Sequence, residues 1–279
     1  MTAPASLPIT LIGGGNMARA LIGGLLGQGL SPALITVAEP AEAVRAALAG
    51  DFGVATTADN AAAAARARVV VLAVKPQVMA PVARGLAATL QATRPLVISV
   101  AAGIRTVDLA NWIGAGVPLV RAMPNRPALV GLGATGLYAA AETGASEREL
   151  ADRLLAATGL VVWVPRESDL ELVTALSGSG PAYFFRLAQL MAECGAALGL
   201  DPEASRQLAA QTLAGAGRLV AAERTPDLAR MSAEVASKGG TTEAALERFA
   251  ALGLDRLVAA AMQAAAERGR ELAAQSGRG

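Results

Sequence analysis

Short apolar runs alternate with helical segments over the first 165 residues of the chain. The apolar runs, rich in Leu, Ile and Val, predict strands at Leu7–Ile12, Leu34–Ala38, Val69–Val74, Leu96–Val100, Leu119–Ala122, Gly136–Ala139 and Val161–Val164. The segments between them predict helices at Met17–Gly27, Ala41–Ala49, Asn60–Ala65, Met79–Leu90 and Ser146–Ala157. Continuous apolar strands joined by helices are typical of a mainly parallel sheet with helices on both faces.

The strand pattern ends at Pro165, and the rest of the chain predicts only helices. These helices are expected at Asp169–Leu198, Pro202–Arg224, Asp227–Ala236 and Thr242–Ala274. The predicted fold class is therefore α/β for a first domain, residues 1–165, followed by an all-helical second domain, residues 166–279.

Two stretches of the helical domain, Ala188–Leu200 and Leu208–Val220, are apolar on more than one face. Such helices must be covered from more than one side, which so small a helical layer cannot provide alone. We therefore expect a homodimer or a higher homo-oligomer. Upstream, Ser177-Gly178-Ser179-Gly180-Pro181 interrupts a helix. This break either kinks the helix or brings backbone close to a substrate pocket or a partner chain.

The first predicted strand leads into Gly13-Gly14-Gly15-Asn16-Met17-Ala18, and a helix follows. Gly13 allows a tight turn, Gly15 removes the Cβ that would block a pyrophosphate, and the small Ala18 lets helix and strand pack closely. The helix N-terminus adds free amides and a positive dipole end for phosphates. Because the pattern stands between a first strand and a helix, it predicts a Rossmann-type domain that binds a nicotinamide dinucleotide.

Glu39 follows the second predicted strand, 24 residues after Gly15. A carboxylate at this position can accept hydrogen bonds from ribose hydroxyls and would repel a 2′-phosphate. The alternative is a solvated surface glutamate. No arginine follows directly, although Arg45 could reach the same region. The sequence therefore predicts NADPH or NADH as cofactor and favours NADH.

Composition removes several classes of function. The net charge of +1 does not indicate a surface that binds nucleic acid. No apolar run approaches the ~18 residues of a membrane span, and Met1–Pro8 lacks the pattern of a secretion signal. Cys194 is the only cysteine and is expected in the core, and histidine is absent. We therefore expect a cytoplasmic protein with no disulfide, no metal site and no imidazole base.

Lysine is rare here: of 24 basic residues, only Lys75 and Lys238 are lysines. Lys75-Pro76 follows the third predicted strand at its C-terminal end, where ligands bind in open α/β sheets. The backbone of this pair is therefore a candidate for cofactor contact. The alternative is a proline that merely ends the strand.

The second lysine lies in Ser237-Lys238-Gly239-Gly240-Thr241-Thr242, just before a predicted helix. Helix-start amides exposed by the glycines, the threonine hydroxyls and the lysine charge together predict an anion site. The alternative is an ordinary Gly-Gly turn with a threonine N-cap.

Six short blocks carry a family resemblance. They are Ile12-Gly13-Gly14-Gly15-Asn16-Met17-Ala18, Ala73-Val74-Lys75-Pro76, Val100-Ala101-Ala102-Gly103, Arg121-Ala122-Met123-Pro124-Asn125, Leu176-Ser177-Gly178-Ser179-Gly180-Pro181-Ala182-Tyr183 and Ser237-Lys238-Gly239-Gly240-Thr241-Thr242. The first is generic to dinucleotide enzymes, whereas the last two are highly specific. In order and spacing, the chain from Ile9 to about Leu272 resembles the pyrroline-5-carboxylate reductase family.

The resemblance implies an oxidoreductase of proline biosynthesis that reduces 1-pyrroline-5-carboxylate to L-proline with NADPH or NADH. It also implies a Rossmann domain, a helical dimerisation domain and an active site between them. The residues that match the family's cofactor contacts are Gly13, Gly14, Gly15, Asn16, Met17, Ala18, Asn60, Ala73, Val74, Lys75, Pro76, Ala101, Ala102 and Gly103.

The family's substrate loop corresponds to Ser237–Thr242. In it, Thr242 and Lys238 are the catalytic candidates, and Ser237, Gly239, Gly240, Thr241 and Thr242 are the candidates for substrate binding. Many family members carry proline where this chain has Lys238. The family's usual contacts to a 2′-phosphate are not evident after the second strand, which leaves a preference for NADPH without support.

The absence of histidine agrees with an imine substrate. Reduction of a ketone places charge on oxygen and usually needs a protein acid. A protonated imine already carries its proton, and hydride addition yields the neutral amine directly. Orientation and proximity can then supply most of the rate enhancement.

Three alternatives stay open at the level of sequence. A 3-hydroxyacid-type dehydrogenase shares this arrangement but needs a proton-transfer lysine on an interdomain helix, and neither Lys75 nor Lys238 is predicted inside a helix. A reductase of another cyclic imine is harder to exclude. A dinucleotide-sensing protein without chemistry would need the glycine turn but no second anion loop.

Overall fold

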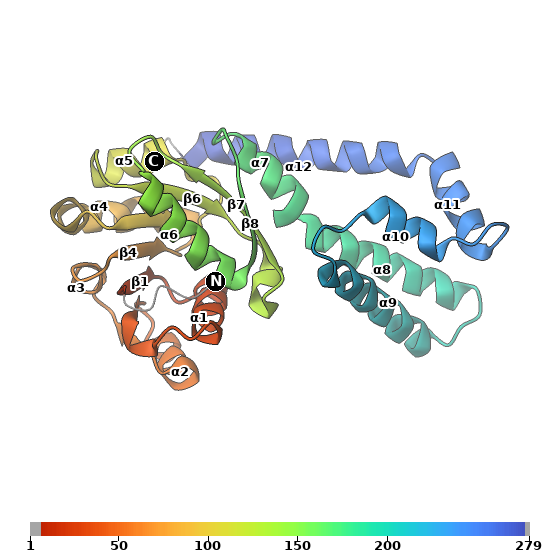
Figure 1. Ribbon diagram of the computed structural model, residues 1–279, viewed down its shortest axis with the longest axis horizontal. Helices are drawn as coiled ribbons and strands as arrows, with labels where there is room; N and C mark the ends of the chain where they lie inside the picture. Colours follow the sequence, from red (N-terminus) through yellow and green to blue (C-terminus); the bar gives the residue numbers. More distant parts are fainter. Residues whose placement is uncertain (1–6, 277–279) are drawn as a thin grey trace. The chain divides into compact units, whose positions relative to one another are not determined.

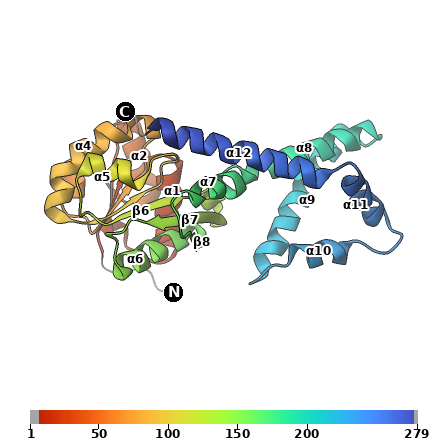
Figure 2. The ribbon, with the colours of Figure 1, turned by 90° about the horizontal axis from the view of Figure 1, so that it is seen from above.

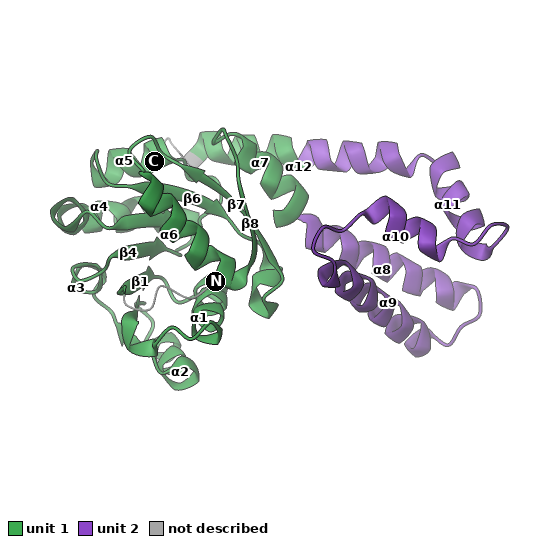
Figure 3. Cartoon of the chain, viewed as in Figure 1, with its two compact units in different colours: residues 1–178, 265–279 green, residues 179–264 purple. Residues whose placement is uncertain are grey.

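The computed structural model of the chain describes residues 7–276. The chain forms two compact units, drawn in green and purple in Figure 3. The α/β unit comprises residues 1–178 and 265–279, and the helical unit comprises residues 179–264. Residues 1–6, which make up most of the segment considered for a secretion signal, lie outside the described range.

An eight-stranded sheet forms the centre of the α/β unit (Figure 1). Its strands are β1 (Ile9–Ile12), β2 (Ile35–Ala38), β3 (Ala55–Thr57), β4 (Val69–Leu72), β5 (Leu96–Ser99), β6 (Leu119–Met123), β7 (Gly133–Ala139) and β8 (Gly159–Trp163). They lie in the order β3-β2-β1-β4-β5-β6-β7-β8. The first six strands are parallel, β7 is antiparallel to β6, and β8 is parallel to β7. This order is that of a dinucleotide-binding Rossmann sheet, so the predicted fold class is confirmed.

Helices cover both faces of the sheet because its central strands are apolar on both sides. They are α1 (Asn16–Gly27), α2 (Glu42–Phe52), α3 (Asn60–Ala64), α4 (Pro76–Thr93), α5 (Thr106–Ile113), α6 (Ala145–Leu155) and α7 (Asp169–Val173), with 3₁₀ turns at Pro32–Leu34, Arg126–Val130 and Ala156–Thr158. Val69 and Val71 of β4 join a core with α1 and α6, whereas Val70 and Leu72 join a second core with α4 and α5. Figure 2 shows α4 and α5 on one side of the strands and α6 on the other.

The sequence pattern did not predict two elements of this unit. β3 has only three residues, none of them buried, and its pairing with β2 defines it. α5 is a short helix that buries Leu109 and Ile113. Its first turn is held by a carboxylate from a distant part of the chain, which no local pattern reveals.

The helical unit contains α8 (Gly180–Ala197), α9 (Pro202–Ala222), α10 (Leu228–Val235) and α11 (Thr241–Ala251). α12 (Leu254–Ser276) begins in this unit and ends in the α/β unit. α8 and α9 pack closely: the Ser205 hydroxyl donates to the Ala192 carbonyl at 2.7 Å, and Gly195 leaves room for Ser205. Cys194 on α8 is exposed in the single chain, so the expectation of a core position is wrong.

Two predicted helices are interrupted. The predicted helix Asp169–Leu198 is divided into α7, a π-helical turn (Thr174–Gly178) and α8, with the break in the predicted Ser177–Pro181 segment. The predicted helix Thr242–Ala274 is divided into α11 and α12 at Gly253. Gly253 has φ of +79°, a conformation that residues with a side chain rarely adopt. α11 and α12 form an angle of 57°.

No single helix in the described part of the chain is long and apolar enough to cross a membrane. By length and composition, α11 and α12 meet that requirement only together, as a bent pair.

The compact units divide the chain at a different place from the predicted boundary between residues 165 and 166. Glu171 of α7 forms an ion pair with Arg121 of β6, and Gly269 of α12 lies against Glu171. Ala266 and Ala273 of α12 are buried as well. These contacts attach α7 and the last part of α12 to the α/β unit.

Candidate active site

The glycine turn after β1 has a backbone that only glycine accommodates at its first position. Gly13 has φ of +101°, and its N–H donates to the Ala38 carbonyl at 2.8 Å. A Cβ on Gly13 would lie 2.8 Å from the Ala73 carbonyl oxygen. Gly13 thus closes the turn and lets the loop after β4 approach it.

Gly15 has a different role in the same turn. It is the N-cap of α1 with φ of −73°, and a Cβ there would meet open space. Among the described residues, no side chain caps this helix. The amides of Asn16, Met17 and Ala18 therefore remain available at a positive helix end, a feature that suits a pyrophosphate.

Glu39 lies directly beside the glycine turn. The Gly14 N–H donates to one of its carboxylate oxygens at 2.9 Å, and the Ala41 N–H donates to the other at 3.0 Å. Each oxygen keeps a second lone pair for another donor. Arg45 donates to the Glu39 and Pro40 carbonyls at 2.8 and 2.7 Å, so it supports the turn after β2.

The loops after β1, β4 and β5 meet at one edge of the sheet because these strands are parallel neighbours. The Ala73 N–H donates to the Ile12 carbonyl at 2.8 Å, and the Val100 N–H donates to the Leu72 carbonyl at 3.1 Å. The structure therefore brings together Gly13–Ala18, Ala73–Pro76 and Ala101–Gly103. Within the second segment, Lys75 is the N-cap of α4 and Pro76 is its first residue.

Asn60 is the first residue of α3, whose N-terminus the Asp59 carboxylate caps. It is half-buried and lines a hollow of ≈ 650 Å³ together with Asp59, Pro81 and Val82. The strand before it, β3, ends beside Glu39, whose N–H donates to the Thr57 carbonyl at 2.9 Å. Asn60 therefore belongs to the β2 side of the same sheet edge.

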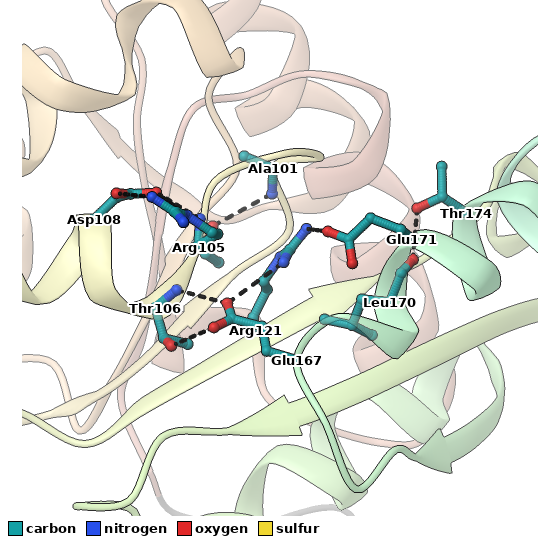
Figure 4. A network of polar contacts seen from close by, with 10 residues as sticks. Ala101, Arg105, Thr106, Asp108, Arg121, Glu167, Leu170, Glu171 and Thr174 are labelled. Atoms are coloured by element: carbon teal, nitrogen blue, oxygen red, sulfur yellow. Dashed lines mark hydrogen bonds and ion pairs between the residues drawn. The ribbon is translucent and has the colours of Figure 1, made fainter. Parts of the chain in front are cut away.

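A buried ion cluster, which the sequence analysis missed, lies next to these loops (Figure 4). Arg121 of β6 is 3% exposed and pairs with Glu167 at 3.4 Å and Glu171 at 3.1 Å. Glu167 also accepts two hydrogen bonds from Thr106. A signal was present, because an arginine inside an otherwise apolar strand must find buried carboxylates.

The same region holds a second polar pair, Arg105 and Asp108. Asp108 accepts from the Arg105 guanidinium at 3.0 Å and from its backbone N–H at 3.3 Å, as in a capping box. This side-chain hydrogen bond raises the pKa of Arg105 above its ordinary value. The charge of Arg105 is thus held at the start of α5.

Asn125, two residues after β6, uses its side-chain amide to hold other parts of the chain. The Asn125 amide donates to the Ser177 carbonyl at 3.0 Å and accepts from the Ala134 N–H at 2.9 Å. A Cβ on Gly178 would lie 2.7 Å from the Met123 methyl carbon. The break before α8 therefore lets the backbone approach the end of β6.

The predicted substrate loop, Ser237–Thr242, belongs to the helical unit. The Gly240 N–H donates to the Ser237 carbonyl at 2.9 Å, which closes a turn with Gly239 at φ of +69°. The Gly239 N–H donates to Glu243 at 2.6 Å, a contact that the sequence analysis missed. α11 begins at Thr241, so the amides of Thr241 and Thr242 lie at a helix N-terminus.

Two family models match the chain. Residues 8–103 match "NADP oxidoreductase coenzyme F420-dependent", and residues 167–272 match "Pyrroline-5-carboxylate reductase dimerisation". The second match begins at Glu167 and so includes α7, which packs in the α/β unit. Among individual proteins, the pyrroline-5-carboxylate reductase of Pseudomonas aeruginosa is 45% identical over 269 residues, covering 96% of this chain and 98% of that protein. The chain belongs to the pyrroline-5-carboxylate reductase family.

A solved structure of a pyrroline-5-carboxylate reductase agrees with this assignment. The structure from Coxiella burnetii has a TM-score of 0.91 at 40% identity, covering 95% of this chain and 98% of that one. The structure from Plasmodium falciparum, solved with NADP bound, has a TM-score of 0.80 at 23% identity and shows the shared fold, covering 96% and 99% of the two chains. The family resemblance predicted from the six sequence blocks is confirmed.

Proposed function

We propose that this chain reduces 1-pyrroline-5-carboxylate to L-proline with NADPH or NADH, the last step of proline biosynthesis. The observation that carries the proposal is the glycine turn of a Rossmann sheet in a chain that is 45% identical, over nearly its whole length, to a pyrroline-5-carboxylate reductase. The proposed enzyme is an oxidoreductase that acts on a C=N bond.

The described residues fit the cofactor. Gly15 and the free amides of α1 would hold its pyrophosphate, and Glu39 and Asn60 would face its adenosine half. The backbone of Ala73–Pro76 and Ala101–Gly103 would line the rest of the sheet edge. When bound, the reduced nicotinamide supplies the hydride.

The substrate's carboxylate would bind at the start of α11. Helix-start amides and hydroxyls of Thr241 and Thr242 can donate to it, and Lys238, exposed beside the turn, adds positive charge. The Glu243 carboxylate accepts a hydrogen bond from the Gly239 N–H and thereby ties the Ser237–Gly240 turn to the first turn of α11. Thr242 and Lys238 are our candidates for groups that orient the substrate and stabilise its charge.

The reaction needs no imidazole. The iminium carbon accepts the hydride, its C=N electron pair becomes the nitrogen lone pair, and the neutral amine of proline results. No proton has to move during this step, so the chain's residues need only orient the substrate and limit water. Neither lysine lies inside a helix, which disfavours a 3-hydroxyacid-type dehydrogenase.

We further propose a preference for NADH over NADPH. The Glu39 carboxylate stands beside Gly14 with free lone pairs for ribose hydroxyls, and its charge would repel a 2′-phosphate. Arg45, the nearby cation, donates to two backbone carbonyls and is thereby held in the turn after β2.

We also propose a cytoplasmic homodimer, or a larger homo-oligomer, joined through the helical unit. A groove of ≈ 630 Å³ between α8 and α9 is lined by Phe185, Ala188, Ala192, Ala209 and Leu213, among others. The matched family model is one of dimerisation, and the groove's apolar lining suits a second copy of the same unit. Because the chain has a single cysteine, it can form no disulfide within itself and would gain no such stabilisation in an oxidising compartment. This favours the cytoplasm.

The proposed activity is tested by adding 1-pyrroline-5-carboxylate to the pure protein with NADH and, separately, with NADPH. We expect oxidation of the cofactor and formation of L-proline, with a higher kcat/KM for NADH. A folded sample that binds either cofactor but forms no proline would overturn the assignment. Running both cofactors also tests the proposed preference.

The proposed substrate loop is tested by Thr242→Val. Loss of one charge-assisted hydrogen bond to the substrate carboxylate should raise the KM for the imine about tenfold and leave the KM for NADH unchanged. Thr225→Val, at an exposed threonine of the same unit, is the control. An unchanged KM for the imine would place the carboxylate site elsewhere.

A further inference from the structure

We propose that Glu167 and Thr106 are positioning residues that hold the Ala101–Gly103 loop in the shape that binds the cofactor. The inference rests on the proposed function, because it assumes that this loop contacts the dinucleotide. Neither residue belongs to the glycine turn, the sheet-edge loops or the substrate loop already described.

Glu167 caps α5 from a distance of 61 residues in sequence. One of its carboxylate oxygens accepts from the Thr106 N–H at 2.7 Å, and the other accepts from the Thr106 hydroxyl at 2.8 Å. Thr106 is the first residue of α5, so its N–H has no partner within the helix. A carboxylate at this position also complements the positive end of the helix. Both oxygens of the Glu167 carboxylate therefore bind Thr106, the residue at which the loop becomes α5.

Arg121 holds Glu167 in turn. Its buried guanidinium donates to Glu167 and to Glu171, so its charge is shared between two carboxylates. In the sheet register Arg121 stands opposite Ser99, the last residue of β5. The Ser99 hydroxyl oxygen accepts from the Ala101 N–H at 3.4 Å. The cluster thus holds the loop where it enters α5, and Ser99, which is paired with Arg121 in the sheet, contacts the loop where it leaves β5 (Figure 4).

Between these two points the loop is a short arch. Ala101 and Ile104 are buried at 4% and 1% exposure, whereas Ala102 is exposed and Gly103 has φ of +78°. The exposed part of the arch makes no described side-chain hydrogen bond of its own. Its position therefore depends on its anchors, and Thr106 is the anchor that a distant part of the chain holds.

Loosening the anchor should displace the loop without removing any contact residue. A small displacement of a binding loop lowers affinity for the ligand it holds and leaves other binding steps unchanged. We therefore expect the cofactor's affinity to depend on Glu167 and Thr106, and the affinity for the imine at saturating cofactor not to depend on them.

The test compares Thr106→Val, Thr106→Ser and Glu167→Gln with the wild type, using Glu142→Gln as control. Glu142 is an exposed glutamate of the same unit. The measurements are the Kd for NADH by fluorescence titration, the KM values for NADH and for the imine, and the urea midpoint. Thr106→Val and Glu167→Gln should raise the Kd for NADH about threefold to tenfold, the loss expected for one hydrogen bond. Thr106→Ser and Glu142→Gln should bind NADH as the wild type does.

Two outcomes would overturn the inference. Thr106→Val and Glu167→Gln could lower the urea midpoint while binding NADH normally, which is the behaviour of residues that only support the fold. Alternatively, Thr106→Ser could bind NADH as weakly as Thr106→Val, so that the hydroxyl is not the relevant group. If Glu167→Gln does not fold, the Thr106 pair still decides. Failure of the proposed function is distinguishable, because it would show as a wild type that makes no proline, whereas these variants are compared by NADH binding.

Discussion

The α/β unit and the helical unit are built from the same few apolar residue types but bury them to very different degrees. In the α/β unit, two core clusters enclose the sheet from both faces. Among the described residues of the helical unit, 179–264, Ala192 is the only apolar residue other than glycine that is buried. Phe184, Phe185 and Leu219 are exposed at 61%, 60% and 63%.

The difference shows that composition alone does not produce a core. A sheet buries side chains on two faces at once when helices cover it, whereas a pair of packed helices covers only one side of each. A soluble monomer rarely leaves so many neighbouring apolar side chains in water. The helical unit is thus the part of the chain whose stability we expect to depend on a second copy.

The candidate sites divide along the same line. The residues proposed for the cofactor all belong to the α/β unit, and the Ser237–Thr242 loop belongs to the helical unit. Loss of the partner should therefore affect the substrate loop first and the cofactor residues least.

The largest effect is expected for Phe185→Glu, which places a charge in the groove between α8 and α9. A central interface aromatic commonly contributes about 2 kcal/mol or more, and a buried unpaired charge adds to the loss. We expect monomers by light scattering, a lower melting temperature and little proline formation. Val130→Glu, at a residue of the α/β unit that is 74% exposed, is the control and should change none of these. An assembled, active Phe185→Glu protein would show that this face needs no partner.

A smaller and more local effect is expected in the glycine turn, where Gly13 and Gly15 should respond differently. Gly13→Ala forces a side chain into positive φ and against the Ala73 carbonyl, so it should destabilise the α/β unit by about 2 kcal/mol. Gly15→Ala meets open space and should change the free energy of unfolding by less than about 1 kcal/mol. It should still weaken NADH binding about tenfold or more, because its Cβ would occupy the path to the pyrophosphate.

Unfolding in urea and NADH titration separate the two glycine variants, and light scattering should give both variants the same molar mass as the wild type. Normal NADH binding by Gly15→Ala would mean that the pyrophosphate does not approach this backbone. A change in molar mass for either variant would show that assembly depends on the glycine turn of the α/β unit as well as on the helical unit.

The smallest effect is expected for Glu39→Ser. Removing the carboxylate should raise kcat/KM for NADPH relative to NADH a few-fold, since one repulsive charge near a solvated 2′-phosphate amounts to about 1 kcal/mol. Glu42→Ser removes an exposed carboxylate from the first turn of α2 and is the matched control. If both variants keep the wild-type ratio, Glu39 takes no part in choosing the cofactor.

Much of this protein is determined by local sequence. The apolar runs at β1, β2, β4, β5 and β6, the glycine turn between Ile12 and Asn16, and the break before α8 all follow from residue types at short spacing. Periodicity and the conformational freedom of glycine act within a few residues, so they can be recognised without the fold.

Tertiary structure decided the rest. β3 exists because β2 lies beside it, and α5 begins where Glu167 caps it from 61 residues away. Arg121 is tolerated in a buried strand only because Glu167, just before α7, and Glu171, in α7, pair with it. Residues 166–178, which the sequence assigned to the helical domain, therefore belong to the α/β unit. Such contacts join residues whose separation in sequence carries no periodic signal, so their energy becomes visible only once the chain has folded.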